Sequence, residues 1–308
     1  MKRVAAIDCG TNSIRLLVAD GGPSGLRDVH REMRVVRLGE GVDETGRLSP
    51  AAIERTRLAL VDYAATIGSL GASEIRMVAT SASRDAANAD EFRAVVRQVL
   101  GAEPEVITGL AEAELSFVGA VAGLPGVASP LLLADIGGGS TELVLGSAAE
   151  GSVLAAHSMD VGCVRMTERH LHDDPPTEAQ IQAAVTDLEA ALKAAAADVP
   201  VAEAAAFVGV AGTVTTIAAL ALELPAYDPV AIHGTVVEYQ QVAEVTDRLL
   251  GMIRAERAAL PVMHPGRVDV IGGGALVLRT LMEFVGAREV IASEHDMLDG
   301  IAMSLLTS

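Results

Sequence analysis

The chain has 308 residues, half of them hydrophobic, a formal net charge of −18 and an isoelectric point of about 4.7. This length is comfortable for two domains. Trp is absent and only three Tyr and four Phe occur, so the core must be built from Ala, Val, Leu and Ile, as in an α/β protein with buried strands. The acidity and the lack of a basic run argue against an extended nucleic-acid groove, so we expect no nucleic-acid partner.

The two cysteines, Cys9 and Cys163, show neither metal-type spacing nor a disulfide framework. No apolar run is long enough to span a bilayer, and the amino terminus runs into a strand without a signal peptide. We therefore expect a soluble, cytoplasmic protein without a membrane partner. Cys9 is interpreted as a small apolar filler rather than a nucleophile.

In the first part of the chain, apolar runs predict strands at residues 4–8, 14–19 and 29–38. Ser49 and Pro50 predict the start of a long helix, because Ser is a good N-cap and Pro is tolerated in the first turn. Gly71 predicts its end. The next expected elements are a strand at 75–79, a helix at 89–100, a strand at 105–108 and a helix at 110–122.

Residues 123–130 hold two Pro and two Gly and are the best linker candidate. We predict domains at 1–124 and 125–308, and leave open that the last helix packs back on the first domain. Beyond the linker, Thr177 and Gln180 form a capping-box pattern before an Ala-rich helix. Other expected elements are strands at 131–134, 206–210, 268–271 and 289–292 and helices at 213–222, 275–285 and 296–306. This order predicts an α/β fold with mixed sheets.

The most informative feature is an internal near-repeat. Residues 8–16 read DCGTNSIRL and residues 135–143 read DIGGGSTEL, so Asp, Gly, Ser and Leu fall at matching positions. Each copy lies between two apolar strands. A single glycine-rich hairpin could be only a tight turn, but two copies with matching Asp and Ser indicate a shared function.

Such hairpins suit phosphate binding. Glycine lets the backbone approach a phosphate and direct N–H groups at it, and Ser and Thr hydroxyls add donors. An acidic residue at the end of the preceding strand can hold a divalent cation. Two hairpins, one per domain, can clamp one phosphate chain across a cleft. A third glycine turn at 272–274, expected between a strand and a helix, fits an anion or nucleotide contact.

Together with the segments at 79–88, 112–115, 162–165, 212–213 and 267–269, these motifs resemble the exopolyphosphatase and guanosine pentaphosphate phosphohydrolase (Ppx/GppA) family. That family belongs to the superfamily of actin, the sugar kinases and a class of heat-shock chaperones. The resemblance implies two ribonuclease-H-like domains with mixed sheets and an interdomain cleft. The length resembles the short actinobacterial exopolyphosphatases, which lack additional carboxyl-terminal helical domains.

The resemblance implies that Glu112 is the general base that activates water for attack on the terminal phosphorus. The family often has Glu-Glu-Ala-Arg here, whereas this chain has Ala-Glu-Ala-Glu at 111–114. Glu112 and Glu114 are two residues apart and would point to different sides of a helix. Periodicity alone does not choose between them.

The resemblance also implies that Asp135 and Glu142 bind Mg²⁺ or Mn²⁺, with Asp8 as the equivalent acid of the first half. Arg84 is expected on the phosphates. The remaining implied phosphate-binding residues are Asn12, Ser13, Gly138, Gly139, Ser140 and Thr141. Arg15 is interpreted as structural, and Arg165 and Arg267 are weaker candidates for binding the phosphate chain. Longer relatives carry Gly-Leu-Arg-Glu-Gly near the end, and residues 296–300 lack its Arg.

We therefore expect a metal-dependent exopolyphosphatase that removes the terminal phosphate of polyphosphate, with a preference for short chains. One alternative substrate is guanosine pentaphosphate, because it shares the phosphoanhydride end. A kinase that transfers phosphate to ADP would need the third glycine turn to hold adenine. A non-catalytic protein that senses polyphosphate or a nucleotide is the alternative from another class. The resemblance further implies a homodimer and ADP or ATP as a possible ligand.

Overall fold

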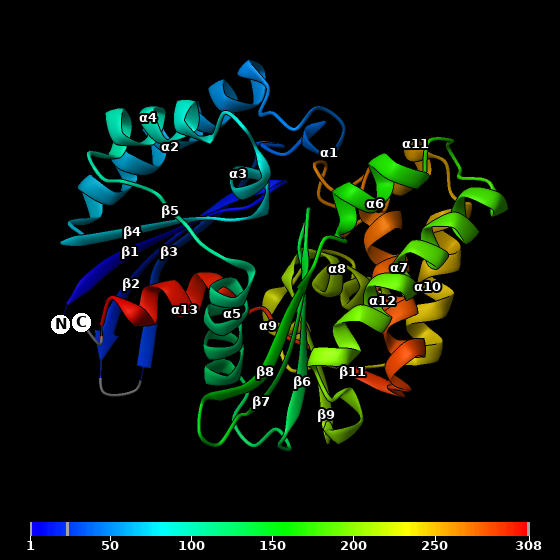
Figure 1. Cartoon of the computed structure of the whole chain (residues 1–308). Helices are drawn as coiled ribbons and strands as arrows, with labels where there is room; N and C mark the ends of the chain where they lie inside the picture. The colour runs from blue at the N-terminus through cyan, green and yellow to red at the C-terminus, as the bar shows by residue number, and fades with distance from the viewer. Residues whose placement is uncertain (1, 23–24, 307–308) are drawn as a thin grey trace. The chain divides into compact units, whose positions relative to one another are not determined.

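The structure is a computed structural model and describes residues 2–22 and 25–306. The chain divides into two compact units, residues 1–119 with 297–308 and residues 120–296. Figure 1 shows the elements of both units. In the described ranges, no helix is both long and apolar enough to cross a bilayer.

The first unit is built on a five-stranded sheet in the order β3-β2-β1-β4-β5. The first three strands form an antiparallel meander, and β4 and β5 run parallel to β1. The strands are β1 (Arg3–Cys9), β2 (Ser13–Gly22), β3 (Gly25–Val35), β4 (Glu74–Ala79) and β5 (Glu105–Val106). Their helices are α1 (Val42–Thr45), α2 (Pro50–Leu70), α3 (Ser81–Asp85), α4 (Ala89–Leu100), α5 (Gly109–Gly123) and α13 (Met297–Ser304). Residues 120–123 of α5 belong to the second unit.

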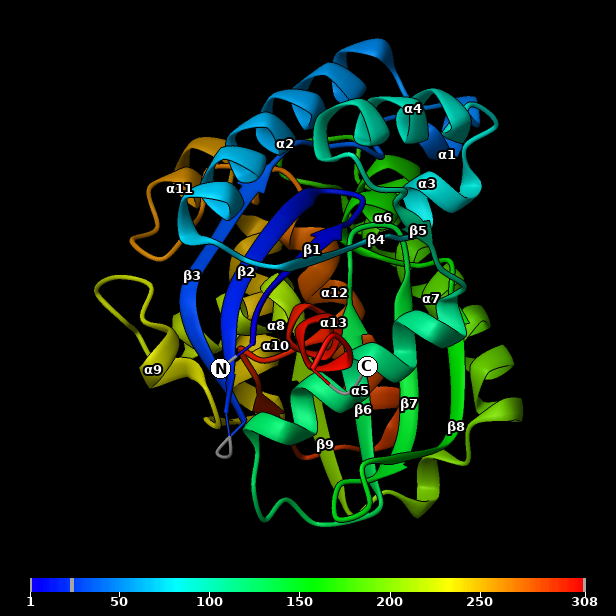
Figure 2. The ribbon, with the colours of Figure 1, turned by 90° about the vertical axis from the view of Figure 1, so that its left-hand side faces the viewer.

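Alternation along β1 explains why both faces of this sheet are covered. Ala5 and Ile7 pack in a cluster with α2 and α4, whereas Val4 and Ala6 pack on the other face with α13. Because successive side chains of a strand point to opposite faces, a strand buried on both sides needs apolar residues throughout. Figure 2 shows α2 and α4 together on one side of the strands and α13, in red, on the other.

The local signals at helix ends act as predicted. The Ser49 side chain accepts a hydrogen bond from the Ala52 N–H at the start of α2, and Gly71 ends that helix at φ 70°. The left-handed region is accessible to glycine without strain. The predicted long helix and the helix at 89–100 are confirmed.

The second unit repeats the strand order of the first. Its six-stranded sheet has the order β10-β11-β9-β6-β7-β8, so the antiparallel meander β6-β7-β8 continues into the parallel strands β9 and β11. An additional antiparallel strand, β10, pairs with β11. The strands are β6 (Leu131–Ile136), β7 (Thr141–Ser147), β8 (Ser152–Met159), β9 (Ala206–Val210), β10 (Val236–Glu238) and β11 (Glu289–Ala292).

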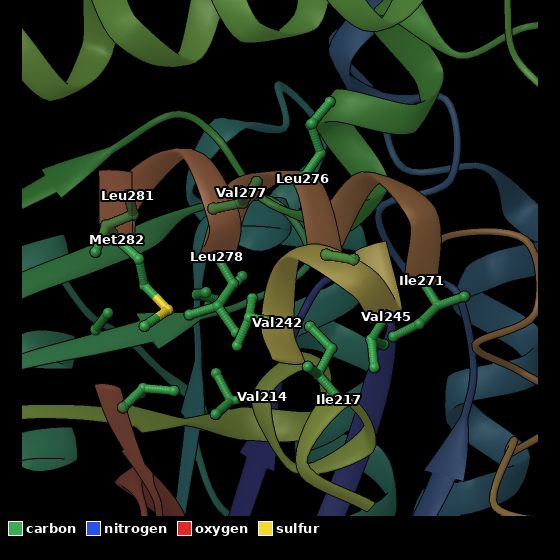
Figure 3. Packing of buried hydrophobic residues seen from close by; sticks show 14 of the residues in the cluster. Val214, Ile217, Val242, Val245, Ile271, Leu276, Val277, Leu278, Leu281 and Met282 are labelled. Carbon is green, nitrogen blue, oxygen red and sulfur yellow. The ribbon is translucent and has the colours of Figure 1, made fainter. Parts of the chain in front are cut away.

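The helices of this unit form most of its core. They are α6 (Cys163–His170), α7 (Glu178–Asp198), η1 (Val201–Glu203), α8 (Ala211–Ala221), α9 (Pro229–Ile232), α10 (Tyr239–Gly251), α11 (Arg254–Ala258) and α12 (Ile271–Val285). Figure 3 shows side chains of α12, α10 and α8 together in this core, among them Leu278, Val242 and Ile217. The predicted capping box of Thr177 and Gln180 opens α7 and is confirmed.

One predicted strand is wrong. Residues 268–270 form turns rather than a strand, and the glycines at 272–274 lie inside the start of α12. A Cβ at Gly273 would lie 2.8 Å from the Cys163 carbonyl oxygen, and one at Gly274 would lie 2.6 Å from Thr213 Oγ1. These glycines therefore let α12 pack closely against α6 and α8, and they do not form a turn between strand and helix. The sequence pattern also gave no prediction of β8 and α6.

Candidate functional site

The first glycine hairpin joins β1 to β2, and backbone hydrogen bonds from a neighbouring segment hold it in place. The Gly10 N–H donates to the Ser13 carbonyl oxygen over 3.0 Å, which closes the turn. The Asn12 carbonyl accepts the N–H groups of Val36 and Arg37, at 3.0 and 2.8 Å. These bonds hold the Asn12 backbone, so the hairpin is a rigid part of the fold and not a loose loop.

Asp8 and Arg15 lie directly opposite each other on β1 and β2. Asp8 is 4% exposed. The Arg15 Nε and Nη2 atoms lie 2.8 and 2.5 Å from the Oδ2 atom of Asp8. A buried carboxylate needs a counter-charge, and Arg15 supplies one here.

Arg84 and Glu112 come together at the carboxyl edge of the same sheet. Arg84 lies in α3, directly after β4, and Glu112 lies in the first turn of α5, after β5. The Arg84 Nη1 atom is 3.0 Å from the Ile107 carbonyl oxygen and 3.4 Å from Glu112 Oε2. Parallel strands end at one edge of a sheet, where α/β proteins commonly bind ligands.

Glu112 and Glu114, which the sequence pattern could not separate, differ in their burial. Glu112 is 7% exposed and faces Arg84, whereas Glu114 is exposed. A buried carboxylate beside a guanidinium is a typical feature of a functional site, and an exposed helix acid is not.

The second glycine hairpin repeats the geometry of the first. The Gly137 N–H donates to the Ser140 carbonyl oxygen over 3.0 Å, at the positions that match Gly10 and Ser13. The Gly137 and Gly138 carbonyls accept the N–H groups of Cys163 and Val164 in α6, each at 2.9 Å. In a trans peptide the N–H points opposite to the C=O. The N–H groups of Gly138 and Gly139 therefore point away from α6, as an anion-binding loop requires.

Gly162 makes this docking of α6 possible. A Cβ at this position would lie 2.5 Å from the Gly138 carbonyl oxygen and 2.8 Å from the Gly137 carbonyl oxygen. Both atoms belong to the backbone and cannot rotate away. The only sequence signal for this role was the family match at 162–165, and it did not indicate which atoms are in contact.

The two hydroxyl side chains of the second hairpin, Thr141 and Ser140, are both buried. Thr141 Oγ1 donates to the Val161 carbonyl oxygen over 2.7 Å, and this bond is buried. The Thr141 hydroxyl proton is thus already used within the fold. Ser140 is also buried, at the bend of the hairpin.

Asp135 and Glu142 are directly opposite residues on β6 and β7, at the positions that Asp8 and Arg15 occupy in the first unit. They are 8% and 1% exposed, and Ser158 Oγ donates to Glu142 Oε1 over 2.7 Å. Directly opposite residues share one face of a sheet, where like charges repel. The second unit thus has two buried carboxylates at the positions where the first unit has a carboxylate and a guanidinium.

This carboxylate pair fits a hard divalent cation. Within residues 2–22 and 25–306, no three His, Cys, Asp or Glu side chains gather into a group that could hold a metal ion. Mg²⁺ is commonly held by only one or two carboxylates, with waters and substrate phosphates in the other positions. The pair therefore suits Mg²⁺ or Mn²⁺ better than a metal that needs a complete protein cage.

The two arginines with weaker sequence support are also in the second unit, and the Arg165 N–H donates to the Gly138 carbonyl oxygen of the hairpin over 3.2 Å. Arg165 Nη1 is 3.1 Å from Asp160 Oδ1. Arg267 Nη1 donates to Thr216 Oγ1 over 2.9 Å, and its guanidinium lies against Gly212, where a side chain would overlap it. Burial and the Arg267 charge together lower the pKa of His264.

Two sheets with one strand order, each with a glycine hairpin between its first two strands, define a duplicated ribonuclease-H-like fold with a phosphate-type loop in each domain. The chain belongs to the Ppx/GppA phosphatase family, whose sequence profile matches residues 17–308.

Individual relatives agree with this assignment. The chain is 54% identical to Exopolyphosphatase 2 of Mycobacterium tuberculosis over 318 residues, covering 99% of each protein. It is 30% identical to guanosine-5'-triphosphate,3'-diphosphate pyrophosphatase of Aeromonas salmonicida over 302 residues, which is 98% of this chain but 59% of that protein.

Solved structures show the same architecture. An exopolyphosphatase-like protein superposes with a TM-score of 0.96 at 41% identity, over 100% of this chain and 99% of the other. The Ppx/GppA family member of Aquifex aeolicus superposes with a TM-score of 0.82 at 30% identity, over 99% and 98% of the two chains.

Proposed function

We propose that this protein is an exopolyphosphatase that hydrolyses the terminal phosphoanhydride bond of inorganic polyphosphate and releases orthophosphate. The observation that carries the proposal is the duplicated hairpin with a buried carboxylate pair, Asp135 and Glu142, in one copy. The full-length similarity to a protein named an exopolyphosphatase supports the substrate. A preference for short chains remains part of the proposal.

The phosphate chain is proposed to be bound by both hairpins and by Arg84. The first turn of α6 donates hydrogen bonds to the Gly137 and Gly138 carbonyls, and the N–H groups of Gly138 and Gly139 therefore point away from α6. The other proposed phosphate-binding residues are Asn12, Ser13, Ser140 and Thr141. Since the Thr141 hydroxyl donates to Val161, Thr141 is expected to contribute least.

Asp135 and Glu142 are proposed to hold Mg²⁺ or Mn²⁺, which when bound would neutralise charge on the phosphate oxygens. The support for this is that the two side chains lie opposite each other on one face of the sheet and are both buried, so they bring together the carboxylate oxygens that such a cation prefers. Asp8 stays a proposed further metal contact, but its charge is already matched by Arg15.

Glu112 is proposed to act as general base. It would take a proton from a water molecule whose oxygen forms the new bond to the terminal phosphorus, while the bond from phosphorus to the bridging oxygen breaks. The electron pair of that bond stays on the remaining chain, which leaves as an anion. Arg84, whose Nη1 atom lies 3.4 Å from Glu112 Oε2, would hold this carboxylate in place and offer its remaining donors to phosphate.

Guanosine pentaphosphate is the second candidate substrate, because a relative with that type of activity in its name matches 98% of this chain. Its terminal phosphoanhydride would use the same groups. A homodimeric, cytoplasmic protein and ADP or ATP as an additional ligand also remain proposals that follow from the family resemblance.

The test is phosphate release by the purified protein with Mg²⁺ or Mn²⁺ from short polyphosphate, long polyphosphate and guanosine pentaphosphate in parallel. Glu112→Gln should lower kcat by about 10²- to 10⁴-fold, the usual contribution of a general base. Glu114→Gln is the matched control, because Glu114 is exposed on the same helix, and it should keep wild-type activity. Binding without release from any substrate would instead identify a sensor protein.

A further inference from the structure

The helix that carries Glu112 packs against the last helix of the chain at a glycine. A Cβ at Gly300 of α13 would overlap the Leu115 carbonyl oxygen of α5, and it would lie 2.8 Å from the Leu115 carbonyl carbon. These are backbone atoms, so no side-chain rotation relieves the overlap. Gly300 therefore sets how closely α5 and α13 approach, and Figure 1 shows α13, in red, beside α5.

Helix α13 is firmly attached to the sheet. Asp299 is 2% exposed, and the Arg31 Nη2 and Nη1 atoms of β3 lie 2.6 and 3.3 Å from its Oδ1 and Oδ2 atoms. This bidentate geometry is the stronger and more directional form of the Arg–carboxylate pair. At the other end of α13, Arg76 Nη1 donates to Ser304 Oγ over 2.6 Å.

Apolar packing adds to this attachment. Leu298 and Ile301 are buried in one cluster with Val4 and Leu17 of the first two strands. In the part of the chain that the structure describes, helix α5 adds Ala111 and Leu115 to this cluster, and both side chains are partly buried. If the two helices are forced apart, α5 is therefore expected to move and α13 to stay.

Movement of α5 would displace Glu112. Leu115 follows Glu112 by less than one helical turn, so the two residues shift together. Arg84 would not follow, because it is held by the Ile107 carbonyl at 3.0 Å. The separation of Glu112 and Arg84 thus depends on where α13 places α5.

We propose that Gly300 and Asp299 are positioning residues for Glu112, so that the carboxyl-terminal helix sets the geometry of the reacting carboxylate. This inference rests on the proposed role of Glu112 as the base. The groups proposed to bind phosphate lie largely on other segments, so the effect is expected on kcat and not on KM.

The experiment compares Gly300→Ala with Gly68→Ala, using phosphate release from short polyphosphate with Mg²⁺. Gly68 lies on the exposed side of α2, where a Cβ would meet no atom within 4 Å, so Gly68→Ala should behave as wild type. Gly300→Ala should lower kcat by about 10- to 100-fold with KM changed by less than about threefold, the cost of misplacing a catalytic group by about 1 Å. Amide hydrogen exchange of α5 should rise in this variant.

Asp299→Asn is the second variant, for the case that Gly300→Ala does not fold. It adds no non-hydrogen atoms and loosens α13 from Arg31, and it should also lower kcat selectively. Wild-type kcat in either folded variant, or a rise in KM that matches the loss in kcat, would overturn the proposal. Glu112→Gln separates the proposed base from the proposed positioning role. If that variant keeps full turnover, the proposal that Glu112 is the base is wrong. If it is inactive while Gly300→Ala turns over normally, only the positioning role fails.

Discussion

Arg84 and Glu112 are 28 positions apart in the chain, yet the Arg84 Nη1 atom lies 3.4 Å from the Glu112 Oε2 atom. The same nitrogen donates to the Ile107 carbonyl oxygen over 3.0 Å, which fixes the guanidinium at the end of β5. The pair is largely shielded from water on the carboxylate side. A counter-charge that is fixed in place and still has free donor positions can serve both the carboxylate and a bound phosphate.

Replacement of Arg84 should therefore affect both binding and turnover. Arg84→Ala leaves the buried Glu112 carboxylate without this guanidinium, and we expect kcat to fall by about 10²- to 10³-fold, with a higher KM for polyphosphate. Arg84→Lys should be intermediate, because an ammonium group is a point charge without the planar fork. Arg93→Ala is the control, since the Arg93 side chain of α4 is 42% exposed and pairs with the exposed Asp90. Steady-state kinetics that show unchanged KM and kcat in Arg84→Ala would exclude this role.

The asymmetry between the two hairpins predicts where metal dependence resides. Asp135→Asn and Glu142→Gln should each raise the Mg²⁺ concentration for half-maximal activity by about tenfold or more, because each removes one of two carboxylates. Asp8→Asn should shift it far less, since Arg15 already matches the Asp8 charge. Titration of activity with Mg²⁺ and with Mn²⁺ measures this directly. An equal shift in Asp8→Asn would establish Asp8 as a metal contact.

The repeated hairpin could be recognised from sequence because its signal is local. Asp8 and Asp135 each end an apolar run, and a glycine follows two positions later in both copies. The structure adds the register, which places Arg15 opposite Asp8 and Glu142 opposite Asp135. The repeat alignment already contained this exchange of Arg for Glu, but its meaning depends on which side chains share a face of the sheet.

Other features depend on contacts between distant segments and were therefore missed or misread. The glycines at 272–274 suggested a turn, because glycine within an apolar stretch is a typical turn signal. They are in α12, where Cys163 and Thr213 from other helices leave no room for a Cβ. At Gly162 and Gly300, too, atoms of a distant segment leave no room for a Cβ. Sequence shows that a glycine is present, whereas only the packed structure shows which neighbour excludes a side chain.

The two thiols are predicted to be inert in the folded protein. Burial raises the pKa of Cys163 to about 11, and burial together with the Asp8 charge raises the pKa of Cys9 further. Since the thiolate is the reactive form, a thiol reagent at about pH 8 should modify neither residue in the native state and both in denaturant. Rapid native modification of Cys163 would show that α6 opens away from the second hairpin. Cys9→Ala should retain activity, because Cys9 acts as a core residue.

His264 should make the folded state less stable in mild acid. Burial first, and the Arg267 charge second, lower its folded-state pKa below the ordinary value of 6.5, and its Nδ1 atom accepts the Gly266 N–H over 3.1 Å. As the pH falls through the ordinary value, the unfolded chain takes up this proton before the folded protein does. The free energy of unfolding therefore decreases as the pH falls. His264→Asn keeps an acceptor without the titration, so its melting temperature should fall less than that of wild type between about pH 7.5 and about pH 5.5, a window above the range in which carboxylates titrate. The other histidines are the same in both proteins and cancel in the comparison. If the melting temperatures of the two proteins fall equally with pH, His264 takes up its proton equally well in the folded and unfolded states.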